Sequence, residues 1–101
     1  MAMPQRIQRK RTKGWKMPPN TVYVGRPTEW GNPFRITDYQ GQDYARRQFC
    51  VDDFREQVMH FDAGFFRNHI RAKLVGKNLA CWCPLNQPCH ADVLLEIANA
   101  R

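Results

Sequence analysis

Cysteine and histidine side chains gather near the end of this chain. Three of its four cysteines and one of its three histidines fall between positions 81 and 90, as Cys81, Cys83, Cys89 and His90. Cys81 and Cys83 alternate along an expected strand, so both thiols point to one face. Thiolate sulfur and imidazole nitrogen are the ligands that tetrahedral zinc prefers. One interpretation is therefore a zinc site made by these four residues, with an iron–sulfur cluster as a second use of the thiols.

The same segment also has the residue types of a reactive thiol. Cys89 lies just before an expected helix, where the helix dipole lowers the pKa of a thiol. His90 and Asp92 follow closely and could serve as base and orienting group, so the catalytic candidates are Cys83, Cys89, His90 and Asp92. A third interpretation has no chemistry, with small thiols buried in the core and His90 capping the helix. These alternatives stay open, and with them the question whether the protein is an enzyme.

A second unusual segment is the loop over residues 25–34, which is punctuated by two glycines and two prolines. Arg26 offers a planar guanidinium for a phosphate or carboxylate. Trp30 could stack on a ligand, and Asn32 offers both donors and an acceptor. The alternative is a tight structural turn in which Trp30 and Phe34 fill the core, as large aromatic side chains usually do.

Positive charge is concentrated at the N-terminus of the chain. The formal net charge is +7, and no acidic residue precedes Glu29. Such a segment on a nearly neutral body is typical of a protein that binds a polyanion, whereas the alternative is a solvated tail. The candidate nucleic-acid-binding residues are Arg6, Arg9, Lys10, Arg11, Lys13 and Lys16.

The elements that must position these residues can be read from hydrophobic periodicity. Apolar residues that include Tyr44, Val51, Phe54, Val58 and Phe61 recur at helical spacing. Strands alternating with helices predict an α/β fold: a small single domain with a short parallel sheet and about three helices, preceded by a basic N-terminal arm. We expect the arm at 1–19, the domain at 20–101, strands at 21–24 and 78–83, helices at 43–61, 65–75 and 91–100, and a third strand within 34–40.

Parallel strands would bring the two unusual segments together. In an open α/β sheet, ligands bind beyond the carboxyl ends of the strands. The loop at 25–34 follows the first expected strand and the Cys/His loop at 81–92 follows the second. We therefore expect a joint site formed by these two loops, which binds a nucleotide or a nucleic acid.

Composition also bears on the compartment. No apolar run approaches the roughly 20 residues of a membrane span, and the first residues lack the apolar stretch of a secretory signal. Four cysteines are then better read as reduced thiols or metal ligands than as disulfides. We expect a cytoplasmic protein that does not bind membranes.

Four motifs together are similar to a known family: Arg9–Trp15, Val22–Pro27, Trp30–Phe34, and Cys81–Cys83 with Pro88–Leu95. The chain closely resembles the bacterial and phage family of domain of unknown function 4326, from about Arg6 to Ala98. The resemblance implies that the basic arm belongs to the domain and that the two loops define the family. It supplies no activity, because the family has none established.

Two further functions compete with ligand binding at the joint site. The first is a nucleic-acid-binding module in which zinc at the cysteine loop is purely structural and the basic arm supplies the affinity. The second is a phage-type protein that binds and inhibits another protein. No feature of the sequence tests this last possibility.

Overall fold

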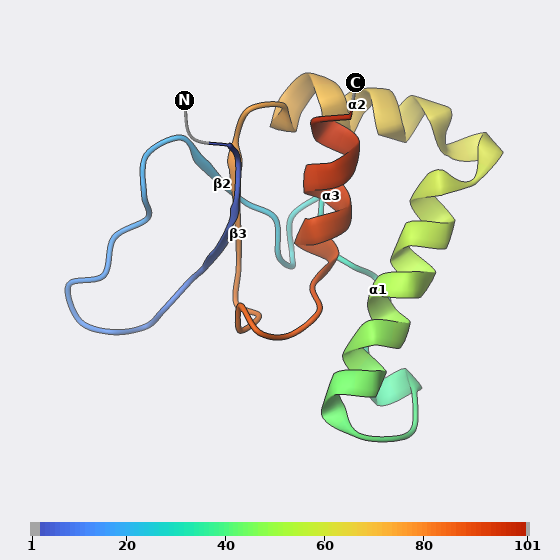
Figure 1. The fold of residues 1–101 in the computed structure, drawn as a ribbon, viewed down its shortest axis with the longest axis horizontal. Helices are drawn as coiled ribbons and strands as arrows, with labels where there is room; N and C mark the ends of the chain where they lie inside the picture. The colour runs from blue at the N-terminus through green and yellow to red at the C-terminus, as the bar shows by residue number, and fades with distance from the viewer. Residues whose placement is uncertain (1–2, 101) are drawn as a thin grey trace.

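The computed structural model of the chain describes residues 3–100. It contains three strands and three α-helices, together with two short 3-10 helices over Ile36–Asp38 and Phe61–Ala63 (Figure 1). In chain order the main elements are β1 (Arg6–Gln8), β2 (Thr21–Tyr23), α1 (Asp43–Met59), α2 (Gly64–Leu74), β3 (Asn78–Cys81) and α3 (His90–Ala98). The expected order of strand, helix, helix, strand and helix is therefore confirmed from β2 onward.

The sheet has the order β1-β3-β2, and both pairings are parallel. Strand β3 lies in the middle, with Leu79 opposite both Arg6 and Val22. Leu79 and Ala80 are fully buried, as expected for the central strand of a sheet that a helical layer covers. In Figure 1 the three helices lie on one side of the sheet. The protein is thus a small mixed α/β domain, as predicted.

The third strand is not where the sequence analysis placed it. Residues 34–40 contain the 3-10 helix Ile36–Asp38, whose first turn is held by the Asp38 carboxylate accepting from the Arg35 amide at 3.2 Å. The third strand is instead β1, which lies within the segment expected to be a basic arm. Hydrogen bonds from Arg9 N to Cys81 O, at 2.8 Å, and from Leu79 N to Gln5 O, at 3.1 Å, extend its pairing with β3. The residues between β1 and β2 form the loop that projects at the left of Figure 1.

The buried stripe of α1 is shorter than its apolar pattern suggests. Cys50, Val51, Phe54 and Val58 are buried, but Tyr44 is 56% exposed. Phe61 lies beyond the end of the helix and is 82% exposed. Helix α1 ends at Met59, and the 3-10 helix Phe61–Ala63 follows it before α2 begins. Tyr44 and Phe61, at the two ends of the predicted apolar pattern, therefore do not pack into the core.

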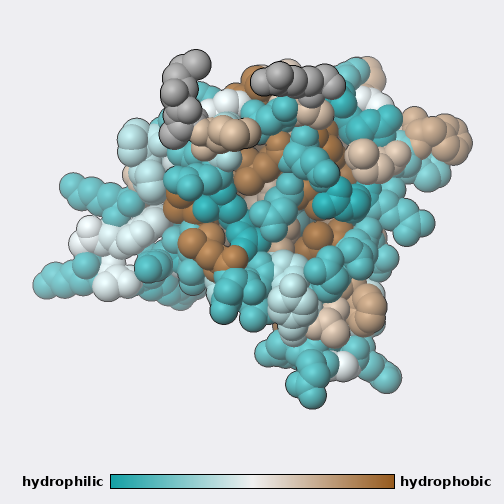
Figure 2. Space-filling model, viewed as in Figure 1, coloured by the Kyte–Doolittle hydropathy of each residue, from teal (hydrophilic) through white to brown (hydrophobic). Residues whose placement is uncertain are grey.

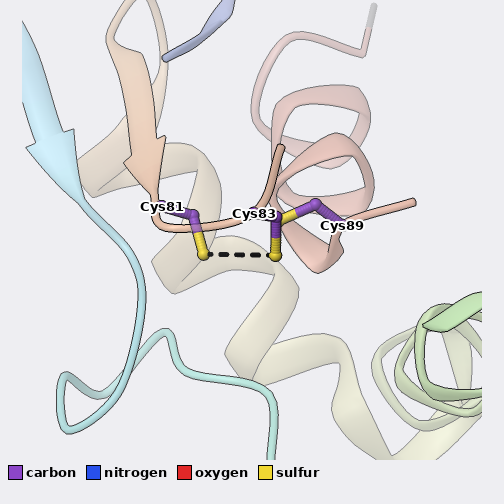
Figure 3. Close-up of side chains that lie close together, drawn as sticks. All are labelled: Cys81, Cys83 and Cys89. Atoms are coloured by element: carbon purple, nitrogen blue, oxygen red, sulfur yellow. Dashed lines mark hydrogen bonds between the residues drawn. The ribbon is translucent and has the colours of Figure 1, made fainter. Parts of the chain in front are cut away.

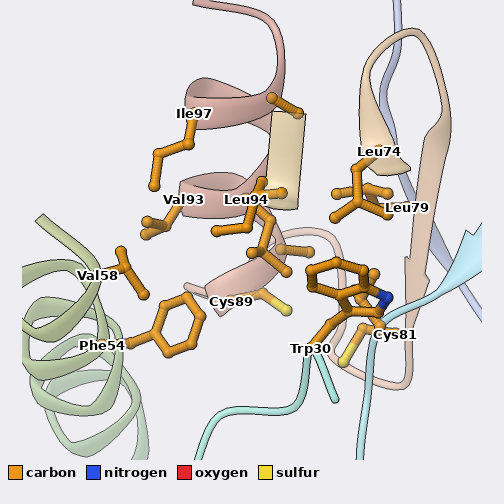
Figure 4. Close-up of a cluster of buried hydrophobic side chains, with 14 of the residues drawn as sticks. Trp30, Phe54, Val58, Leu74, Leu79, Cys81, Cys89, Val93, Leu94 and Ile97 are labelled. Carbon is orange, nitrogen blue, oxygen red and sulfur yellow. The ribbon is translucent and has the colours of Figure 1, made fainter. Parts of the chain in front are cut away.

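Helix α3 lies at the centre of the core. It packs between α1, α2 and the sheet, and Val93, Leu94 and Ile97 point into the cluster drawn in Figure 4. Phe54 and Val58 reach the cluster from α1.

The surface seen in Figure 2 is mostly hydrophilic, with apolar side chains showing in places between hydrophilic ones. No helix within residues 3–100 has both the length and the apolar character needed to cross a membrane.

Leu94 tests this packing because its side chain is fully buried at the centre of the core. Leu94→Ala should lower the free energy of unfolding by about 2–5 kcal/mol, since it removes buried methyl groups and leaves a cavity. The matched control Leu85→Ala changes a leucine that is 58% exposed and should shift stability by no more than about 0.5 kcal/mol. Urea unfolding followed by tryptophan fluorescence measures both. Equal effects would contradict the placement of α3.

Candidate functional site: a thiol and arginine pocket at the carboxyl edge of the sheet

The carboxyl ends of all three strands meet at one edge of the sheet. Val24 N donates to Ala80 O at 2.9 Å, so the chains leaving β2 and β3 start side by side. A pocket of about 480 Å³ opens there, lined by residues from both the 25–34 loop and the segment 81–90. The expected convergence of these two loops is therefore found, and α1 and the segment after the 25–34 loop complete the walls.

Three thiols lie together in the wall of this pocket. The Sγ atoms of Cys81, Cys83 and Cys89 are all within 4.8 Å of one another, and those of Cys81 and Cys83 are 3.7 Å apart (Figure 3). Cys81 ends β3, and Cys89 is the residue directly before the first turn of α3, so a strand end and a helix start position the group. The turn between them returns the chain to the same point. Three cysteines in this arrangement could hold a metal ion.

Hydrogen bonding within the group favours one thiolate over three. The neighbouring thiols of Cys83 and Cys89 favour the thiolate form of Cys81, which holds the pKa of Cys81 well below its ordinary value. Proximity to Cys81 raises the pKa of Cys83 and of Cys89, with burial adding to both shifts. A second thiolate beside that of Cys81 is therefore opposed by like-charge repulsion and by burial.

His90 lies beside the thiols but outside their group. Its Nε2 is 2.8 Å from the Val24 carbonyl oxygen, and its Nδ1 is 3.7 Å from Cys89 Sγ. Because a carbonyl can only accept, Nε2 is the donor in this contact. The ring is buried and stands edge-on to Phe54 at 5.4 Å. Of the four predicted metal ligands, the structure brings three together.

Asp92 lies away from the pocket and does not complete a catalytic group. Its carboxylate is 53% exposed and pairs with Arg6 at 3.0 Å. The first turn of α3 turns His90 toward the pocket and Asp92 away from it, because two residues along a helix correspond to about 200° of rotation. The expected sequence of thiol, imidazole and carboxylate is thus not assembled, although Cys83, Cys89 and His90 all line the pocket.

The 25–34 loop divides its three candidate residues between the pocket and the body. Arg26 lines the pocket, with its guanidinium held by the Asn32 carbonyl at 2.8 Å and the Phe34 carbonyl at 3.1 Å. The Asn32 side chain also reaches the pocket wall, but it donates to Cys50 O and accepts from Phe34 N, which makes it the centre of the turn. Trp30 is 7% exposed and stacks on His69 at 5.0 Å, so the core alternative holds for this residue.

The six basic candidates also fall into different environments. Arg6 is built into the fold, because its guanidinium donates to the carbonyls of Pro84, Leu85 and Gln87. Arg9 lies over the rings of Tyr23 and Trp82, at 4.5 and 4.7 Å from their centroids. Arg11 also lies over Trp82, at 4.9 Å. The other three, Lys10, Lys13 and Lys16, are exposed on the loop between β1 and β2.

Two cationic residues of the pocket escaped the sequence analysis. Arg35 and Arg47 line it, and a guanidinium nitrogen of Arg47 lies 3.9 Å from Cys83 Sγ. The signal for Arg47 is its spacing: it stands four and seven residues before the buried Val51 and Phe54, on the inward face of α1. A charged residue at such a position usually has a partner or a ligand. Arg35 follows Phe34 in an irregular segment and has no comparable signal.

The fold and the pocket define a small α/β domain with a thiol cluster at the carboxyl edge of its sheet. Residues 7–100 match the family described as Domain of unknown function (DUF4326), and the chain belongs to this family. The match covers nearly the whole chain and confirms the resemblance found in its motifs. No curated protein and no solved structure matches the chain.

Arg6 makes a sharp test of whether the N-terminal segment is part of the fold. Arg6→Ala removes three hydrogen bonds to the turn after β3 and should lower the free energy of unfolding by about 2–3 kcal/mol. Lys10→Ala, in the exposed loop, should cost no more than about 0.5 kcal/mol. Asp92→Asn removes only a partly exposed ion pair and should cost about 0–1 kcal/mol. A loss with Asp92→Asn as large as with Arg6→Ala would contradict the role of the carbonyls.

Proposed function

We propose that the protein binds a phosphate-bearing nucleotide, either free or at the end of a nucleic-acid strand, in the pocket at the carboxyl edge of the sheet. The observation that carries this proposal is the charge of the pocket. Three guanidinium groups line it, from Arg26, Arg35 and Arg47, and no carboxylate is among the described residues of its wall. Guanidinium groups match phosphate oxygens in charge and in geometry.

The size of the pocket and its aromatic rim support a nucleotide over a simple anion. A volume of about 480 Å³ falls within the range of small-molecule sites, about 300–1,000 Å³. Tyr23, Phe34 and Trp82 lie in its wall, and Trp82 is 37% exposed. Bases stack on aromatic rings and on guanidinium planes. Arg9 and Arg11 lie over the Trp82 ring, so a base at this rim would stack on one of their guanidinium planes or replace it on the ring.

We further propose that the three-thiol group holds zinc. Zinc binds thiolates at about 2.3 Å, so two sulfurs of a tetrahedral site lie about 3.8 Å apart. The Sγ atoms of Cys81 and Cys83 are 3.7 Å apart, which is close to that edge. A divalent cation would also remove the repulsion that opposes a second and a third thiolate. Reduced thiols fit the expected cytoplasmic location.

The guanidinium of Arg47 provides the cleanest test of anion binding. Arg47→Ala should weaken binding of adenosine 5′-monophosphate by about 10- to 100-fold, because a charge-assisted hydrogen bond is lost. Arg55→Ala is the matched control, since it removes the same charge from α1 but pairs with Glu96 outside the pocket. Isothermal titration calorimetry on protein of equal metal content measures both. Equal losses would mean that net charge alone attracts the nucleotide.

Variants of the loop between β1 and β2 can distinguish the two candidate ligands, a free nucleotide and the end of a nucleic-acid strand. If a strand end is the ligand, Lys10, Lys13 and Lys16 contact the phosphates that follow. The triple alanine variant should then weaken binding of a 5′-phosphorylated oligonucleotide and reduce its salt slope by up to about 3, while binding of the mononucleotide is unchanged. Fluorescence anisotropy at several salt concentrations gives the slope. An unchanged oligonucleotide slope would assign the pocket to a free nucleotide.

A further inference from the structure

We propose that the cysteine metal site is open: Cys81, Cys83 and Cys89 are its only protein ligands, and an anionic atom of the bound nucleotide occupies its fourth position. This inference rests on the proposed function and deepens it, because it gives the metal a direct role in recognising the ligand. It also differs from the four-ligand site of Cys81, Cys83, Cys89 and His90 that the sequence suggests.

The first support is the direction in which the thiol group faces. All three cysteines lie in the wall of the same pocket as Arg26 and Arg47. Cys81 and Cys89 are buried by the core, whereas Cys83 is partly exposed. Figure 3 shows the Cys81 and Cys83 side chains pointing the same way, away from β3. A cation bound by these sulfurs would therefore lie at the pocket surface and not behind it.

The second support is the supply of protein ligands. Within the described residues, the group of atoms close enough to share a metal ion contains three cysteines and nothing else. The nearest imidazole is that of His90, whose Nδ1 lies 3.7 Å from Cys89 Sγ but does not fall within 4.8 Å of all three sulfurs. Its ring stands edge-on to Phe54 and would have to move from this position to reach a metal held by the three cysteines. Three protein ligands and one open position is the arrangement of reactive or ligand-binding zinc sites, whereas structural sites have four protein ligands.

The third support is charge. Zinc with three thiolates carries a net charge of −1, which opposes a phosphate at the fourth position unless cations are close. Arg47 has a guanidinium nitrogen 3.9 Å from Cys83 Sγ, and Arg26 and Arg35 share the pocket. These groups can neutralise the thiolates and the phosphate together. With no carboxylate in the described wall to serve as a general base, the geometry supports anion binding by the metal in place of carboxylate-assisted hydrolysis.

Cobalt(II) substitution tests the inference because its visible spectrum reports the ligands of the metal. The full chain loaded with one Co²⁺ should show sulfur-to-cobalt charge-transfer bands, and Cys83→Ser should lose part of their intensity. His90→Ala should leave the band positions of the unliganded protein unchanged. Addition of azide, and separately of adenosine 5′-monophosphate, should shift the ligand-field bands, the latter with the same Kd as calorimetry gives. X-ray absorption of the zinc protein, which needs no variant, should show three sulfurs and one light atom without imidazole scattering.

The outcomes separate this inference from the proposed function. If calorimetry shows nucleotide binding but neither anion moves the cobalt bands, the open site is wrong and the nucleotide pocket stands. Imidazole scattering in the zinc protein, or a changed resting spectrum in His90→Ala, would also overturn the open site in favour of a closed one. If azide shifts the bands but no nucleotide binds by calorimetry, the metal is open but the nucleotide is not its fourth ligand, and the proposed function fails.

Discussion

The parallel pairing of β3 with both β1 and β2 is the constraint on which the site depends. Three strands that run the same way deliver their following segments to one edge, so the 25–34 loop and the cysteine turn meet there. An antiparallel β2 would send the 25–34 loop to the opposite edge, and an antiparallel β1 would send the segment that carries Arg9 there. The helices α1 and α2 supply the crossover between β2 and β3, and α1 adds Arg47 to the wall of the pocket.

The cysteine turn is held in place by a residue distant in sequence. Arg6 is 9% exposed at its side chain, and it satisfies three carbonyls of the turn that separates Cys83 from Cys89. A buried guanidinium with this many acceptors fixes the path of a loop that has no strand or helix of its own. The N-terminal segment thus serves the site twice, first through Arg6 beneath the turn and then through Arg9 beside Trp82 at the pocket rim.

The elements with a hydrophobic pattern of their own could be predicted, and the one without such a pattern could not. Helices α1, α2 and α3 follow from spacing, because burial of one face over several turns leaves a repeated signal, and β2 and β3 follow from short runs of β-branched, aromatic or apolar residues. Strand β1 has three residues and one apolar side chain, Ile7, so its pairing depends on β3 being available. The position of Trp30 in the core does not follow from the sequence for the same reason, since its stacking on His69 is a tertiary contact. Arg47 could have been found by its position on the buried face of α1.

The charges of the site explain why its thiols and its arginines occur together. The guanidinium of Arg47 lies 3.9 Å from Cys83 Sγ and favours negative charge on the neighbouring sulfurs. If a divalent metal binds as proposed, three thiolates and the cation together carry a net charge of −1. The arginines of the pocket would then stabilise the metal-bound group. Their remaining capacity is available for a second anion, and a phosphate that also contacts the metal would use both sources of attraction at once.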